Sequence, residues 1–193
     1  MTGSFFGVDR PQYRFEPVTP QQAGDLEQFS RSHGKFRYCS CMRWRLPSAQ
    51  YREIGRDGRA AALDELVQAG RPAGVLAYLG EDVVGWCSIA PRESYLAILA
   101  SRVIPRLPGE GVWSVACFFL APQARHRGMP ARLLEAACAY AAHSGARIVE
   151  SYPWPGGASY RYMGTRDLYI GAGFHDMTVP DGYRPVMRRT LRP

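Results

Sequence analysis

Residues 112–142 read VWSVACFFLAPQARHRGMPARLLEAACAYAA, and this stretch decides the fold. Its first part, Val112–Leu120, is an almost unbroken apolar run, rich in β-branched and aromatic residues and too short for an ordinary helix. It predicts a strand buried on both faces. Its last part, Pro130–Ser144, places Leu and small residues on one stripe and predicts an amphipathic helix. Pro130 suits a first helical turn, and Gly145 suits the position just past a helix end.

A tight basic turn, PQARHRGM, joins this strand to this helix. The first turn of a helix leaves N–H donors unpaired, and the peptide dipoles place partial positive charge there. Gly128 lets an anion approach the backbone, and Arg125, His126 and Arg127 add charge around it. The turn is therefore a candidate site for a phosphate or pyrophosphate. The alternative is an ordinary connection with solvated arginines.

Between Leu120 and Ala131 the chain has the pattern LxPxxRxxGxPA, which resembles the acetyl-CoA signature of the GNAT N-acetyltransferase superfamily. In that family the loop amides hold the CoA pyrophosphate, and the end of the preceding strand pairs with the pantetheine. The resemblance implies acetyl-CoA as co-substrate. The residues that it implies are Phe118, Phe119 and Leu120 for the pantetheine, and Arg125, His126, Arg127, Gly128, Met129, Pro130 and Ala131 for the pyrophosphate. Pro130 departs from the Gly or Ala of the signature and offers no N–H, which predicts modestly weaker affinity for CoA.

Length and composition fit one soluble globular domain spanning residues 1–193, because 46% of the residues are apolar. The formal net charge of +7 permits anionic partners such as nucleic acid, membrane headgroups or a phosphorylated cofactor. The positive charge is almost all arginine, Lys35 being the one lysine, which is typical of a GC-rich bacterial genome. The arginines form no block, and this disfavours nucleic-acid binding.

Cysteine usage and the chain start favour a cytoplasmic protein. The N-terminus has no charged-then-apolar leader, and no run is long enough for a membrane span. The five cysteines are an odd number, which suits reduced thiols better than a disulfide framework. Cys39-x-Cys41 lacks a second pair with zinc-finger spacing, so no metal site is expected. Whether the protein is a homodimer is left open.

The order of elements predicts a mixed-sheet α/β (α+β) fold of about seven strands and four main helices, which matches the GNAT acyl-CoA N-acyltransferase layout. The expected strands are Tyr13–Val18, Gly74–Leu79, Val83–Ala90, Val112–Leu120, Arg147–Tyr152, Phe174–Val179 and Pro185–Leu191. The expected helices are a segment from Thr19 to about Ser30, then Arg59–Ala69, Pro130–Ser144 and Thr165–Gly171. A further short helix is expected within Glu93–Pro108.

The segment His33–Arg45 mixes aromatic, basic and thiol side chains with no clean period. In GNAT proteins this region shapes the acceptor pocket, and its Cys-x-x-Trp-type spacing resembles an uncharacterised bacterial subgroup. The resemblance implies that the acceptor is bound by Tyr38, Cys41, Trp44 and Arg45. Aromatic packing under a long loop is the alternative.

Tyr169 is the candidate acid for the leaving group. The pattern LYxxxGF that begins at Leu168 resembles the family motif whose tyrosine protonates the CoA thiolate. A phenol and a thiol have similar reference pKa values, so this transfer is chemically feasible. The alternative is a core aromatic residue.

The general base is not identified by a motif. Ser114 stands where histone-type members carry a glutamate. Glu150 is a carboxylate among apolar residues and could accept the amine proton, directly or through water. It could equally pair with an arginine such as Arg92, which we favour slightly. The candidates of lower weight are His33, His126, His143 and His175. The family's carbonyl-holding strand N–H corresponds to Phe118 or a neighbour.

These features together predict an N-acetyltransferase that moves an acetyl group from acetyl-CoA to a primary amine of a small molecule or peptide by direct transfer. Two alternatives remain open at this level. The first is a GNAT-fold module that binds acyl-CoA without turnover, and the second is a basic nucleic-acid-binding protein.

Overall fold

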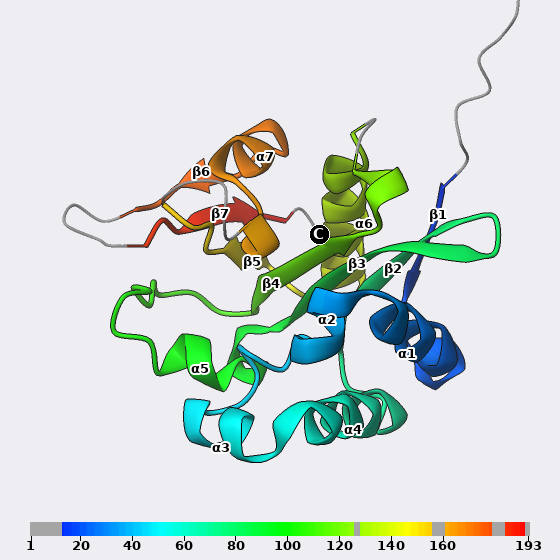
Figure 1. The fold of residues 1–193 in the computed structure, drawn as a ribbon. Helices are drawn as coiled ribbons and strands as arrows, with labels where there is room; N and C mark the ends of the chain where they lie inside the picture. The colour runs from blue at the N-terminus through cyan, green and yellow to red at the C-terminus, as the bar shows by residue number, and fades with distance from the viewer. Residues whose placement is uncertain (1–12, 126–127, 156–160, 179–183, 192–193) are drawn as a thin grey trace, which may run out of the picture.

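The computed structural model describes residues 13–125, 128–155, 161–178 and 184–191 (Figure 1). His126, Arg127 and the predicted turn at 180–182 lie outside these residues. Among the described helices, none combines the length and the apolar character needed to cross a bilayer.

One seven-stranded sheet runs through the molecule in the order β1-β2-β3-β4-β5-β7-β6. All neighbouring strands are antiparallel except β4 and β5, which are parallel and joined by a helical crossover. The strands are β1 Tyr13–Pro17, β2 Val75–Leu79, β3 Asp82–Pro91, β4 Val112–Leu120, β5 Ile148–Ser151, β6 His175–Asp176 and β7 Met187–Thr190. The predicted mixed seven-stranded sheet is therefore confirmed.

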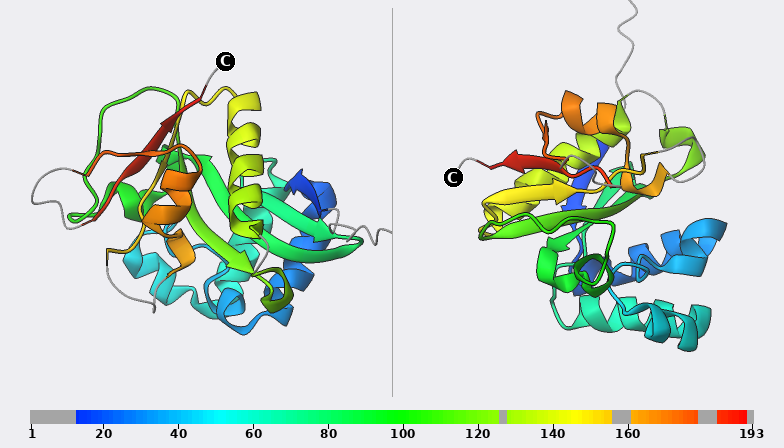
Figure 2. Two further views of the ribbon diagram at one scale, coloured as in Figure 1. Left: turned by 90° about the horizontal axis from the view of Figure 1, so that it is seen from above. Right: turned by 90° about the vertical axis from the view of Figure 1, so that its left-hand side faces the viewer.

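Helices cover both faces of this sheet, with the first four on one side and α6 and α7 on the other (Figure 2). The helices are α1 Ala23–Ser32, α2 Gly34–Cys39, α3 Ser48–Glu53, α4 Gly55–Gln68, α5 Leu96–Leu99, α6 Met129–His143 and α7 Arg166–Gly171. A 3₁₀ turn, η4, spans Arg161–Met163. The apolar stripe of α6 is buried as its period predicts, and its inner face packs on β2 and β3.

Strands β4 and β5 separate where the site is expected. Their pairing ends at Val115 and Ser151, whereas β4 continues to Leu120. The β3–β4 register also shifts, because Ser88 pairs with Cys117 and the next residue of β3 pairs with Val115. Ala116 is thus an extra residue, and a β-bulge of this kind re-aims the strand beyond it.

Several predicted boundaries were wrong. The segment His33–Arg45 contains α2 rather than irregular chain throughout, and α3 was not predicted at all. The helix expected from Arg59 begins four residues earlier, at Gly55. The strand expected over Phe174–Val179 is only the two residues of β6 within the described chain.

Candidate active site

The N-terminus of α6 is open to an anion. Gly128 is its N-cap and has φ of 73°, a left-handed conformation that favours glycine. No side chain caps this end, and no acidic residue lies in the first turn. Arg132 N–H already bonds to the Gly128 carbonyl, so the N–H groups of Met129 and Ala131 remain available to a ligand, whereas Pro130 has none.

The residues predicted for the pyrophosphate differ in what they can offer. The Met129 side chain is fully buried, so its contribution is limited to its backbone N–H. Pro130 occupies the second position of α6 rather than the first, and Ala131 is exposed one position later. Arg125 is exposed, and its Nε donates to the Leu120 carbonyl at 3.3 Å.

The end of β4 presents one free edge and two opposite faces. No strand pairs with β4 on its β5 side from Ala116 to Leu120 among the described residues, so this edge can accept an extended ligand by backbone pairing. Phe118 points toward α7, with its ring centroid 6.4 Å from that of Tyr169. Phe119 points to the other face, where it stacks on Phe36 at 5.6 Å.

A cavity of about 200 Å³ lies against the second face of β4. It is lined by Phe36, Cys39, Cys41, Arg43, Trp44, Tyr51, Cys117, Phe119 and Tyr162. Ser40 and Cys41 have φ of 45° and 49°, so the chain leaves α2 through two left-handed residues. This bend places Cys41 in the core, where Trp86 Nε1 donates to its Sγ at 3.0 Å.

Two of the four predicted acceptor residues line this cavity, namely Cys41 and Trp44. Arg45 does not line it: its side chain is 4% exposed, and its Nη2 donates to the carbonyls of Pro72 and Ala73. Tyr38 is 63% exposed on α2 and is not part of the lining. No local pattern predicts which arginine faces the cavity, because the left-handed residues Ser40 and Cys41 reset the direction of the chain.

Sequence reasoning missed several lining residues: Cys39, Arg43, Tyr51, Cys117 and Tyr162. Cys117 carried a usable signal, because it is the neighbour of Phe118, to which the carbonyl-holding strand N–H of the family corresponds. Tyr51 and Tyr162 lie in segments with no motif, and only the fold brings them to the cavity.

Tyr169 is fully buried between α6, α7 and β4. Its hydroxyl donates to the Met163 carbonyl at 2.9 Å, and its ring packs edge-on against Phe174. Burial raises its pKa well above the usual value, so the phenol stays protonated at neutral pH. A proton donor must be protonated, but this hydroxyl has to leave Met163 before it can serve a thiolate.

Glu150 is fully engaged with neighbours. Arg188 Nε donates to its Oε1 at 2.9 Å, Arg92 Nη1 to its Oε2 at 3.3 Å, and Tyr152 to Oε2 at 2.8 Å. Tyr152 also bonds to Ser114 at 2.9 Å, and burial raises its pKa well above the usual value. The pairing with Arg92 that the sequence favoured is present, and Arg188 provides a second guanidinium partner for the same carboxylate.

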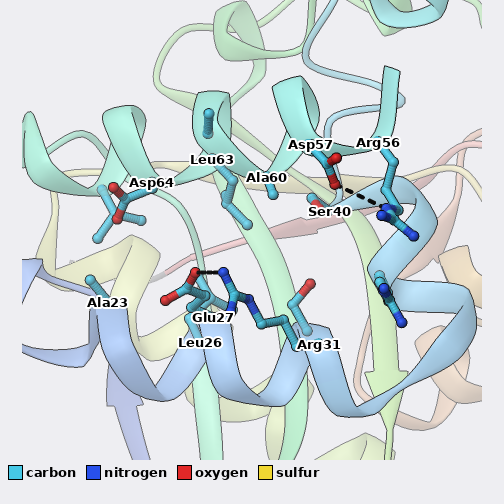
Figure 3. A pocket seen from close by; sticks show the side chains of 14 residues that line it. Ala23, Leu26, Glu27, Arg31, Ser40, Arg56, Asp57, Ala60, Leu63 and Asp64 are labelled. Carbon is cyan, nitrogen blue, oxygen red and sulfur yellow. Dashed lines mark hydrogen bonds and ion pairs between the residues drawn. The ribbon is translucent and has the colours of Figure 1, made fainter. Parts of the chain in front are cut away.

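A larger cavity, about 600 Å³, opens between α1 and α4 (Figure 3). Some of its charges neutralise one another, since Glu27 pairs with Arg31 at 2.7 Å and Arg56 with Asp57 at 3.0 Å. No residue of β4 lines it. Its size therefore does not make it the reaction site, because the bulge and the open strand edge lie at the smaller cavity.

The sequence matches a model of the acetyltransferase (GNAT) family over residues 38–154. A search of curated protein sequences finds no significant match. Solved structures with this fold include an acetyltransferase of the GNAT family from Streptococcus pneumoniae, 14% identical with a TM-score of 0.55, covering 94% of this chain and 100% of that one.

Two further structures share the fold at low identity. PaiA N-acetyltransferase from Thermoplasma acidophilum, solved with coenzyme A, is 12% identical with a TM-score of 0.54 and coverage of 93% of this chain and 99% of that one. Polyamine N-acetyltransferase from Drosophila melanogaster, which forms N-acetylagmatine, is 13% identical with a TM-score of 0.56 and coverage of 93% and 100%.

Proposed function

The chain belongs to the acetyltransferase (GNAT) family and is an acetyl-CoA-dependent N-acetyltransferase, and we propose that its acceptor is a primary amine of a small molecule. The observation that carries the proposal is the separation of β4 from β5 after Val115, beside the uncapped N-terminus of α6. An acyl group placed at that gap lies between a phosphate site and the cavity against Phe119. The small volume of that cavity favours a small molecule over a peptide.

In this arrangement the chain's own groups have separate tasks. The first-turn N–H groups of α6 bind the pyrophosphate, and Arg125 adds a positive charge beside them. The open edge of β4 pairs with the pantetheine, and a β4 N–H near the bulge, at Phe118 or a neighbour, holds the thioester carbonyl. The amine enters from the cavity, and its orientation toward the thioester supplies much of the rate.

Glu150 is a weak candidate for the base, because its carboxylate already has three partners. Protonating it would remove the charge that balances Arg92 and Arg188. We therefore propose that the amine loses its proton to solvent or to a water near the cavity mouth, and that Glu150 acts by holding β5 and β7 together.

The proposed function is tested with a panel of amines incubated with acetyl-CoA. Released thiol and the mass of the acetylated product are measured together, so that simple thioester hydrolysis is distinguished from transfer. We expect thiol release to depend on one class of amine and to match product formation mole for mole. Acetyl-CoA binding without amine-dependent release would instead support a binding module without turnover.

Replacing Tyr169 with Phe tests the acid role. If its hydroxyl protonates the thiolate, kcat should fall about 100-fold while the affinity for CoA is unchanged. The lost hydrogen bond to Met163 should also lower the free energy of unfolding by roughly 1 kcal/mol. Thiol release measures kcat, calorimetric titration measures the affinity for CoA, and denaturant titration measures the free energy of unfolding.

Tyr140→Phe is the matched control, because Tyr140 lies on α6 with its ring against Trp113 and away from the proposed thiolate. We expect this variant to keep full kcat. A Tyr169→Phe enzyme that loses stability but keeps kcat within about twofold would make Tyr169 a structural residue only.

We also propose that the protein works in the reducing cytoplasm. All five cysteines are free thiols in the structure. Burial raises the pKa of Cys39 and Cys138, the latter to about 12, so both remain protonated thiols.

A further inference from the structure

Arg43 supplies the positive charge of the small cavity. Its guanidinium lies 5.1 Å from the Trp44 ring centroid and 5.8 Å from that of Tyr51. Within the described chain it has no hydrogen bond and no ion pair, although its side chain is half-buried. A half-buried cation without a counter-ion is uncommon unless a ligand provides one.

Arg59, which contacts the same tyrosine ring, differs from Arg43 because its N–H donors are engaged. Arg59 also lies over the Tyr51 ring, at 4.2 Å, but its donors are used by Tyr51 Oη at 3.0 Å, by the Gly55 carbonyl and by the Tyr38 carbonyl. Arg59 therefore positions Tyr51, while the five N–H donors of Arg43 stay available.

The rest of the lining is apolar and uncharged. Among the described residues around the cavity there is no aspartate or glutamate. The thiols of Cys117 and Cys39 are neutral, because a hydrogen bond with Cys41 and burial raise the pKa of Cys117 well above its usual value, and burial raises that of Cys39. Burial also raises the pKa of Tyr51. No carboxylate of this lining can form an ion pair with a second amine of a polycationic acceptor.

The cation and the strand residues of β4 lie on different walls of the cavity. Arg43, Trp44 and Tyr51 come from the segment after α2 and from α3, whereas Cys117 and Phe119 come from β4 beyond the bulge. A compact acceptor with its anionic group on Arg43 would lie over the rings of Phe36 and Phe119. Its amine would then face the open edge of β4, where the thioester is proposed to lie.

We propose that the acceptor is an α-amino acid with an apolar or aromatic side chain, whose carboxylate binds Arg43. This inference rests on the proposed function, because it names the substrate class for the same reaction site. Arginine binds a carboxylate through two parallel N–H bonds, and the partly apolar surroundings strengthen such a charge-assisted pair.

The experiment uses L-phenylalanine, L-leucine and L-methionine, each paired with its uncharged carboxamide, and spermidine as a polycation. Because the carboxamide also lowers the pKa of the α-amine, kcat/KM is expressed per unprotonated amine. For at least one pair we expect kcat/KM to be about 10-fold to 100-fold higher for the acid than for the amide. Arg43→Gln should remove this preference by lowering kcat/KM for the acid while leaving the amide nearly unchanged.

Arg52→Gln is the matched control, because Arg52 is an exposed arginine next to Tyr51 that does not line the cavity. It should keep the preference for the acid. Equal kcat/KM for acid and amide in every pair, a preference for spermidine, or equal loss on both substrates in Arg43→Gln would overturn the inference.

A binding measurement separates failure of the inference from failure of the proposed function. The same acids and amides are titrated calorimetrically into the enzyme saturated with CoA. Acids that bind in an Arg43-dependent way without turnover would support the inference and contradict catalysis. Acetylation of amines other than these acids would support catalysis and contradict the inference. Failure of the acids to bind would also contradict the inference.

Discussion

Ala131→Glu is expected to raise the dissociation constant of CoA by about 100-fold or more, because like charges in contact cost several kcal/mol. Ala131 is exposed in the first turn of α6, which has no acidic residue, and the new carboxylate would lie beside the proposed pyrophosphate site. The fold should not suffer, since a glutamate at this helix position is stabilising by about 0.3–1 kcal/mol. The substitution therefore moves affinity and stability in opposite directions.

Calorimetric titration of CoA and chemical denaturation measure the two quantities. Ala131→Gln is the control, because it adds similar bulk without charge, and it should weaken binding several-fold at most. If Ala131→Glu binds CoA as tightly as the unchanged protein, the pyrophosphate does not lie at the N-terminus of α6.

Glu150→Gln is expected to lower the free energy of unfolding by about 3 kcal/mol or more, because it leaves two arginines without a buried counter-charge. The Glu150 side chain is 2% exposed, and those of Arg92 and Arg188 are 6% and 15% exposed. Glutamine preserves the shape and can still accept the bond from Tyr152, so the loss would come mainly from the missing charge. Denaturant titration followed by circular dichroism measures it.

Glu135→Gln provides the comparison at the surface. Glu135 pairs with Arg189, but its side chain is 58% exposed, so this substitution should cost roughly 0–1 kcal/mol. A Glu150→Gln protein that is as stable as the Glu135→Gln protein, but has lost its kcat, would return Glu150 to the role of general base.

The parts of the fold that the sequence predicted are those whose signals are local. The strand of 112–120 and the helix that follows it appear with nearly the predicted bounds, and Thr165 caps α7 through the Leu168 N–H as its residue type suggests. Helices α2 and α3 have six residues each and were missed. Helices of this length are marginal in isolation and depend on tertiary packing, which no local pattern records.

In the candidate site, too, the part with a local sequence signal was predicted and the part assembled by tertiary packing was not. The proposed cofactor site follows from one continuous motif, whereas the cavity proposed for the acceptor joins α2, the chain after it, α3, β4 and η4. The position of Arg43 in the cavity lining, with Arg45 buried elsewhere, depends on the two left-handed residues Ser40 and Cys41. Ordinary residue preferences place neither of them in that conformation, so the sequence alone named Arg45 rather than Arg43.

The walls of the small cavity have a consequence for how this enzyme can diverge. Phe36, Cys41 and Phe119 are core residues, 2%, 3% and 8% exposed, as well as wall residues. Mutations there would change substrate choice and folding together, and natural variation at such positions is constrained by the threshold for stable folding. New acceptor preferences would therefore arise first at Arg43, Trp44 and Tyr51, where the side chains are only partly enclosed.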